Sequence, residues 1–189
     1  MKEDSTSERD QKEIICIPEK DTKKRFVLGQ KGEKNLLVIA LNPSKANEER
    51  LDPTSRNVAS LAERYSCDGW LMANLSPIRT SKPENLPTTQ DQSIFDESLI
   101  EIIAIIKGKY GAVDKVLLSW GNNIVIRPYL AQNAKQIMDA VTSSGISIYA
   151  LRLTAAGHPY HCGPRAVNRF LGGIEKAKMH LLGSKELKG

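Results

Sequence analysis

The sequence has no long apolar run, because none of its stretches reaches the roughly 18 apolar residues that a membrane-spanning helix needs. Its first residues, MKEDSTSERDQKE, are polar and lack the apolar centre of a signal peptide. We therefore expect a cytoplasmic protein with no membrane contact. We also expect residues 1–12 to be disordered and residues 13–189 to form a single domain around one core.

Cysteine is scarce, and the three cysteines, Cys16, Cys67 and Cys162, form no C-x-x-C pair. This spacing argues against a disulfide framework and against a four-cysteine metal site. His158 and His161 have the spacing of metal ligands, but no third ligand stands out. The sequence also lacks both G-x-x-x-x-G-K-[ST] and G-x-G-x-x-G, so we expect neither a nucleotide-phosphate loop nor a cofactor or metal ion.

The net charge of +5 is concentrated at one end of the chain. Residues 151–189 hold seven basic and two acidic side chains, so this segment alone accounts for the whole excess. Such a segment is typical of a surface that contacts nucleic-acid phosphates. A solvated helix face would give the same composition, and charge alone leaves the two interpretations open.

Strands and helices alternate along the chain, with a long proline-containing loop over residues 76–91. This order predicts an α/β fold with three layers, in which a mainly parallel sheet lies between helices. Asp52 and Pro53 are typical of the start of a helix. We expect strands over residues 13–17, 25–29, 36–41, 69–75, 114–120 and 146–153, and helices over residues 52–65, 92–108, 127–144 and 165–182.

Unusual polar and aromatic residues follow four of the expected strands. In a parallel sheet, ligands bind beyond the carboxyl ends of the strands, so these residues are expected to share one site. Taken singly, Asn42 also suits a turn, Asn74 a local cap and Trp120 the core. The residues in question are Asn42, Pro43 and Ser44 after the first of these strands, Asn74 and Arg79 at the second, Trp120 at the third, and His158, Tyr160 and His161 after the fourth.

With ALNPS, LMANLSP, VLLSWGN and AAGHPYH in this order, the chain resembles a family of small bacterial and phage proteins known only as a domain of unknown function. More distantly, the same order resembles the uracil-DNA glycosylase superfamily. That resemblance implies a central parallel sheet between helices, a first strand followed by Asp-Pro or Asn-Pro, a later strand that ends in Asn, and a last loop that begins with His-Pro.

The resemblance implies a role for each matching residue. Asn42 matches the position that handles the attacking water, Asn74 the position that reads the base edge, and His158 the histidine of the last loop. We place Pro43, Ser44, Arg79 and Trp120 with Asn74 at the base. The DNA contacts are then expected from Tyr160, His161, Arg165 and Arg169. The chain departs from the superfamily pattern at Ala40, where glycine is usual, and in the loop sequence His-Pro-Tyr-His.

In the uracil-specific branch of that superfamily, a tyrosine after Asp-Pro crowds the 5-position of the base, whereas this chain has Ser44. The hypothesis is therefore a monomeric DNA glycosylase that flips out and excises a bulky 5-modified pyrimidine, such as hydroxymethylated or glucosylated cytosine, leaving an abasic site. Defence against phage is a fitting setting. The alternatives are uracil-type repair and a module that binds nucleotide or nucleic acid without catalysis.

Overall fold

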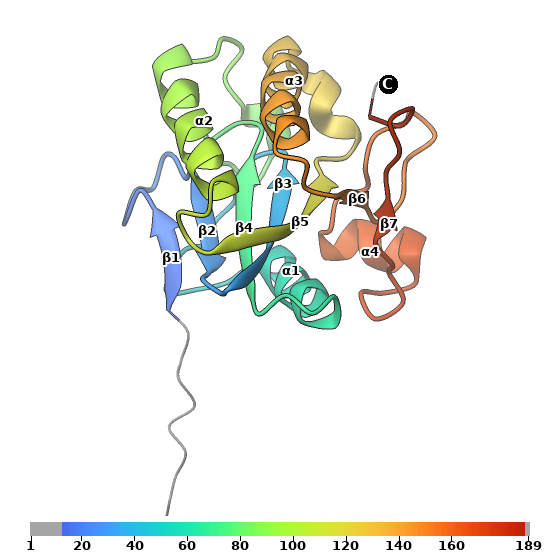
Figure 1. Ribbon diagram of the computed structural model, residues 1–189. Helices are drawn as coiled ribbons and strands as arrows, with labels where there is room; N and C mark the ends of the chain where they lie inside the picture. Colours follow the sequence, from blue (N-terminus) through green and yellow to red (C-terminus); the bar gives the residue numbers. More distant parts are fainter. Residues whose placement is uncertain (1–12, 188–189) are drawn as a thin grey trace, which may run out of the picture.

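The computed structural model describes residues 13–187, so the segment expected to be disordered, residues 1–12, lies outside the described residues. The described part is an α/β structure with one seven-stranded sheet (Figure 1). The strand order is β1-β2-β4-β3-β5-β6-β7. The strands are β1 (Ile14–Ile17), β2 (Val27–Gln30), β3 (Lys34–Ala40), β4 (Gly69–Asn74), β5 (Ala112–Ser119), β6 (Ile148–Ala150) and β7 (His180–Leu181).

The four central strands, β4, β3, β5 and β6, are parallel, whereas antiparallel pairings join β2 to β4 and β1 to β2 at one edge and β7 to β6 at the other. The two short strands expected over residues 13–17 and 25–29 correspond to β1 and β2, which pair with each other at one edge of the sheet. The mainly parallel character of the sheet is confirmed.

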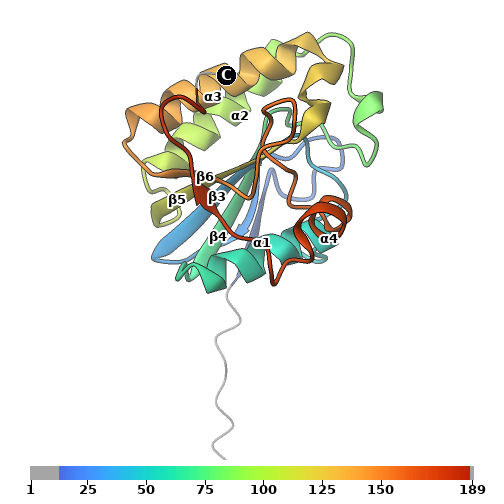
Figure 2. The same ribbon diagram turned by 90° about the vertical axis from the view of Figure 1, so that its right-hand side faces the viewer.

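Helices cover both faces of the sheet, with α2 and α3 on one face and α1 and α4 on the other (Figure 2). The two faces have separate hydrophobic clusters: Leu37 and Ile39 of β3 pack toward α2 and α3, while Leu36 and Val38 pack toward α1 and α4. The helices are α1 (Pro53–Arg64), α2 (Gln92–Ile106), α3 (Pro128–Ser143) and α4 (Pro164–Leu171), with short 3-10 helices η1 (Pro83–Asn85) and η2 (Asn122–Ile126).

The start of α1 agrees with the sequence pattern. One oxygen of the Asp52 carboxylate accepts hydrogen bonds from the backbone N–H and the hydroxyl of Ser55, both at 2.8 Å. This cap satisfies a backbone donor of the first turn, and Pro53 follows it with a backbone angle that suits the helix. The cap fixes where α1 begins, which is beside the carboxyl ends of the parallel strands.

The last helix is much shorter than predicted, because it ends at Leu171 and not at Leu182. Gly172 follows it in the left-handed conformation, with φ of 74°, and Gly173 also has positive φ. Two glycines in such conformations terminate a helix. The chain then turns back, and His180, which was expected on that helix, pairs with Ala150 at the sheet edge.

Candidate functional site

A cavity of about 650 Å³ lies at the carboxyl ends of the parallel strands, on the face of the sheet that α1 and α4 cover. Its wall includes the ends of β3 and β4, the segment after β5, and the N-terminal ends of α1 and α4. This is the place where an open parallel sheet is expected to bind a ligand. The volume is within the range of small-molecule sites, which is roughly 300–1,000 Å³.

Most of the residues that the sequence pointed to meet around this cavity. Three do not line it, namely Pro43, Arg79 and His158. Those that do are Asn42, Ser44, Asn74, Trp120, Tyr160, His161, Arg165 and Arg169.

Asn42 is held by its own amide group. Its Nδ2 donates to the backbone carbonyls of Pro43, at 3.0 Å, and Thr80, at 2.7 Å. Within the described residues its Oδ1 has no hydrogen-bond partner, so that oxygen is left to accept one from a water or ligand. Because two carbonyls surround the nitrogen, an amide fits here and a carboxylate does not. Pro43 itself is buried and contributes its carbonyl to the loop, not a face to the cavity.

Asn74, the last residue of β4, has a side chain that lacks partners although it is buried. The residue is only 1% exposed, and neither its Oδ1 nor its Nδ2 has a hydrogen bond within residues 13–187. Leaving a buried polar group unpaired costs about 1–3 kcal/mol, so such groups are uncommon in folded proteins. A ligand with one donor and one acceptor on adjacent atoms would satisfy both amide atoms, and the edge of a nucleobase has that pattern.

Trp120 directly follows β5, which lies on the other side of β3 from Asn74 and β4, and it is 8% exposed. It packs in the hydrophobic cluster beneath α2 and α3, which agrees with a core role. Its indole N–H is nevertheless buried without a partner among the described residues, and the residue lines the cavity. Packing and a donor for a ligand are therefore compatible at this position.

Arg79 lies outside this cavity, contrary to its predicted place beside the base. Its guanidinium donates to the backbone carbonyls of Lys24, Ser44 and Ala46. These bonds tie the loop after β4 to the loop after β3. Because these carbonyls occupy donors of its guanidinium, Arg79 supports the loops that carry Asn42 and Ser44.

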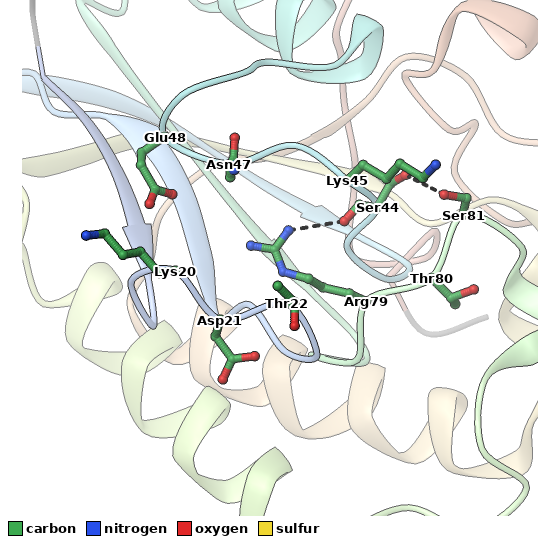
Figure 3. A pocket seen from close by; sticks show the side chains of 10 residues that line it. All are labelled: Lys20, Asp21, Thr22, Ser44, Lys45, Asn47, Glu48, Arg79, Thr80 and Ser81. Atoms are coloured by element: carbon green, nitrogen blue, oxygen red, sulfur yellow. Dashed lines mark hydrogen bonds between the residues drawn. The ribbon is translucent and has the colours of Figure 1, made fainter.

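Arg79 does line a second cavity of about 360 Å³, which Figure 3 shows together with Ser44, Thr80 and Ser81. Those last three residues also line the main cavity, so the two cavities are neighbours. The hydroxyls of Ser44 and Ser81 lie 3.3 Å apart on this shared wall. A side chain larger than serine at position 44 would project into one or both spaces.

The histidine at the main cavity is His161, not His158. After β6 the chain makes a tight turn, in which Thr154 N–H donates to the carbonyl of His158 and Leu153 forms an isolated bridge with Pro159. Thr154 lines the cavity, but the turn carries His158 away from it, and the chain returns to the cavity wall with Tyr160 and His161. The histidine in the wall therefore comes three residues later than the match to the last loop implied.

His161 is held in one tautomer. Its Nδ1 accepts a hydrogen bond from the Gly163 N–H at 2.9 Å, so the proton of the neutral ring is on Nε2. Burial lowers the pKa of His161 below its ordinary value, and the Asp52 carboxylate opposes this shift in part. The imidazole is therefore neutral near pH 7, with an N–H that can donate to a ligand.

The segment around His161 is fastened to the ends of neighbouring elements. Cys162 N–H donates to the hydroxyl of Ser119, at 2.8 Å, and Asn57 of α1 donates to the Cys162 carbonyl, also at 2.8 Å. Gly121 N–H donates to the carbonyl of Pro159. A β-carbon at Gly163 would lie 2.6 Å from His161 Nδ1, so glycine is needed there to give the ring room.

The rim of the cavity is basic and aromatic. Tyr160 and Phe170 have ring centroids 5.4 Å apart, and the Arg169 guanidinium lies 5.2 Å from the centre of the Phe170 ring. Phe170 is 47% exposed, and Arg165 and Arg169 are exposed on α4. Apart from its place on that helix, nothing in the sequence indicated that Phe170 would lie at the cavity.

Arg25 is a second residue that the sequence did not single out. It is 2% exposed, lines the cavity and donates through Nη1 to the Ala46 carbonyl at 2.9 Å. Burial, and next the neighbouring Arg79, lower the pKa of Arg25 to about 10, which leaves the guanidinium charged at neutral pH. A single arginine before the short strand β2 gives no pattern by which sequence alone could have found it.

The residues that the structure describes contain no helix long and apolar enough to cross a membrane. They also contain no group of three or more histidine, cysteine, aspartate or glutamate side chains placed to hold a metal ion.

Comparison with protein families gives one match, over residues 25–162, to the family described as "Protein of unknown function (DUF1643)". Comparisons with curated proteins and with solved structures give no match. The matched range includes β3, β4 and β5, α1 and the loop that carries His161, whereas the part of the cavity wall formed by Gly163 and α4 lies outside it. The chain belongs to this DUF1643 family.

Proposed function

We propose that the protein is a DNA glycosylase that hydrolyses the bond between a flipped-out base and its sugar. The observation that carries this proposal is Asn74, a buried amide with two unpaired atoms on the wall of a cavity at the strand ends. Enzymes of this kind must move the base out of the helix, at a cost of about a few kcal/mol, and then read its edge inside a pocket. Asn74 supplies one acceptor and two donors for that reading.

The chemistry follows from the groups beside it. Asn42 Oδ1 accepts a hydrogen bond from the attacking water, which is thereby aimed at the sugar C1′. The C1′–N bond breaks, its electron pair stays with the base, the water oxygen bonds to C1′, and the released proton ends on the base through solvent. His161 Nε2–H donates to the base as negative charge grows there.

An amide at position 42 positions water but removes its proton poorly. The reaction therefore depends on a leaving group that is well stabilised, which favours a site rich in donors around the base. His161, Asn74 and the indole N–H of Trp120 are such donors. The active residue of the last loop is then His161, in place of His158.

The proposed substrate is a 5-modified pyrimidine, such as hydroxymethylated or glucosylated cytosine. Ser44 lies on the wall that the main cavity shares with the second cavity, so a substituent on the base would have space beyond it. Such bases occur in phage genomes, and we propose defence against phage as the setting, in the cytoplasm and with the protein acting as a monomer. Uracil repair needs no such space.

The rim accounts for the contact with DNA. Arg165 and Arg169 are exposed beside the cavity and are free to approach backbone phosphates. The exposed ring of Phe170, packed on Tyr160, is an apolar wedge for the gap that the flipped base leaves. A module that only binds nucleic acid would use the same rim without releasing a base.

We expect Asn42→Ala to lower the rate of base release by on the order of 100-fold or more while DNA binding changes little, because positioning of water acts mainly in the transition state. Abasic-site formation and DNA affinity are measured on the same duplex. The control is Asn85→Ala, which removes an exposed amide outside the cavity. If Asn42→Ala releases the base at the normal rate, Asn42 is only a turn residue.

Gly163→Ala tests His161 without changing its chemistry. The backbone at Gly163 has φ of −68°, which alanine adopts, but the added methyl carbon displaces the ring. We expect the catalytic rate to fall by about 10- to 100-fold, as for a small misplacement of a catalytic group. The control is Gly183→Ala, outside the cavity, where φ is not in the left-handed region and the added carbon would make only an ordinary contact, with Glu186 Oε2 at 3.7 Å. Equal effects from the two variants would exclude a role for His161.

Position 44 tests the substrate. We expect the wild type to release 5-hydroxymethylcytosine or glucosylated cytosine, and Ser44→Tyr to block that release by filling the shared wall of the two cavities. Ser44→Ala keeps the space and removes only the hydroxyl, so it shows whether release depends on the space at position 44 or on a hydrogen bond from the serine. Release of uracil but of neither modified base would contradict the substrate that we propose.

Charge reversal of Arg165 and Arg169 to glutamate is expected to weaken DNA binding and to make its salt dependence shallower by about two phosphate contacts. Binding is measured across a range of salt concentrations. The matched control reverses Lys178 and Lys185, which are exposed, do not line the cavity and change the net charge equally. If both double variants lose the same affinity, the rim of the cavity is not the DNA-binding surface.

A further inference from the structure

Arg25 is a buried cation that the steps described above leave unused. Within the described residues it forms no ion pair, and its Nε is buried without any hydrogen-bond partner. In the part of the chain that the structure describes, the guanidinium is held by one hydrogen bond, from Nη1 to the Ala46 carbonyl. A buried charge without a partner is costly for a fold, since desolvation is not repaid by an opposite charge.

The surroundings make this charge more costly. Among the charged neighbours, the guanidinium of Arg79 has the largest effect on it, and it has the same sign. Both arginines donate to the carbonyl of Ala46. Asp52 is the single acidic residue in the cavity wall among the described residues. Its carboxylate opposes the effect of Arg79 in part but forms no ion pair with Arg25, and one of its oxygens is engaged by Ser55 at the start of α1.

The charge also faces a ligand site. Arg25 lines the same cavity as Asn74, whose two amide atoms are likewise buried and unpaired. Two buried side chains on one cavity wall that both have unsatisfied polar atoms are better explained by a common ligand than by two separate defects. An arginine presents donors in a planar fork, which suits an oxygen that carries negative charge.

We propose that Arg25 forms an anion-binding site in the wall of the cavity and takes a negatively charged oxygen of the ligand that Asn74 contacts. The site itself does not depend on catalysis, whereas the source of the oxygen rests on the proposed function. In that reaction the electron pair of the broken bond stays on the ring nitrogen of the departing base, and the negative charge spreads to the neighbouring carbonyl oxygen. Arg25 then stabilises this oxygen and compensates for the weak base at position 42. The other source is a fixed phosphate of a bound nucleotide.

The first experiment measures anion binding without any reaction. Thermal unfolding is followed in a low-salt buffer with and without inorganic phosphate, and then with deoxyuridine 5′-monophosphate and with deoxyuridine. The variants are Arg25→Met, which keeps much of the length and removes the charge, and Arg25→Lys. Arg152→Met is the control, because Arg152 is exposed and does not line the cavity.

We expect phosphate to raise the melting temperature of the wild type and of Arg152→Met by about 2–4 °C near saturation, and not to raise that of Arg25→Met. Without added anion, Arg25→Met should melt at or above the wild-type temperature, since it removes an uncompensated buried charge. Arg25→Lys should retain part of the response. If Arg25→Met fails to fold or melts well below the wild type, Arg25 is a structural residue and the proposal is overturned. Equal anion responses in the wild type and Arg25→Met overturn it as well.

The second experiment identifies the source of the oxygen. Base release is compared for two bases that differ in the acidity of the departing nitrogen. If the departing base is the anion, Arg25→Met slows release of the less acidic base by a larger factor. If the anion is a fixed phosphate, Arg25→Met weakens binding of the nucleotide, not of the nucleoside, and slows both bases alike. Phosphate stabilisation that depends on Arg25 in a protein that releases no base would retain the anion site and reject the glycosylase.

Discussion

The register of three parallel strands determines the site. Ala40 at the end of β3 lies opposite Asn74 of β4 on one side and Ser119 of β5 on the other. The three chains therefore leave the sheet at the same level, and the residues that follow them meet. Asn42 comes two residues after Ala40 and Trp120 directly after Ser119. A shift of one residue in either pairing would turn the Asn74 side chain or the Ser119 hydroxyl to the other face of the sheet.

The loops that follow these strands are held in place by hydrogen bonds from residues at or near the strand ends. Ser119 accepts the N–H of Cys162 and so places His161 over the strand ends. Asn42 and Arg79 bind backbone carbonyls of neighbouring loops and hold the segment after β3 against the segment after β4. Against this fixed frame, the Asn74 amide and the Nε of Arg25 are buried without a hydrogen-bond partner among the described residues. The backbone around the cavity is fixed, while polar side-chain atoms in its wall lack hydrogen-bond partners, as expected for a preorganised binding site.

The sheet and the strand-end site could be predicted because periodic patterns and strand ends are local properties of the sequence. The continuous apolar run in β3 and the Asp-Pro start of α1 are of this kind. The extent of the last helix could not be predicted from its apolar spacing, since the conformation of Gly172 and Gly173 decides it. The exchange of His158 for His161 depends on a turn held by Thr154, and the burial of Arg25 depends on tertiary packing far along the chain.

We propose that the protein cleaves the bond between sugar and base when the base lies in the cavity. The most direct measurement is mass spectrometry of the free bases released from duplex DNAs that carry uracil, 5-hydroxymethylcytosine or glucosylated cytosine, with the abasic sites counted in the same samples. The account predicts that a modified cytosine appears as a free base in a one-to-one ratio with abasic sites, and that no strand break precedes it. Tight binding of these DNAs with no free base from any of them would contradict the account and leave a binding module.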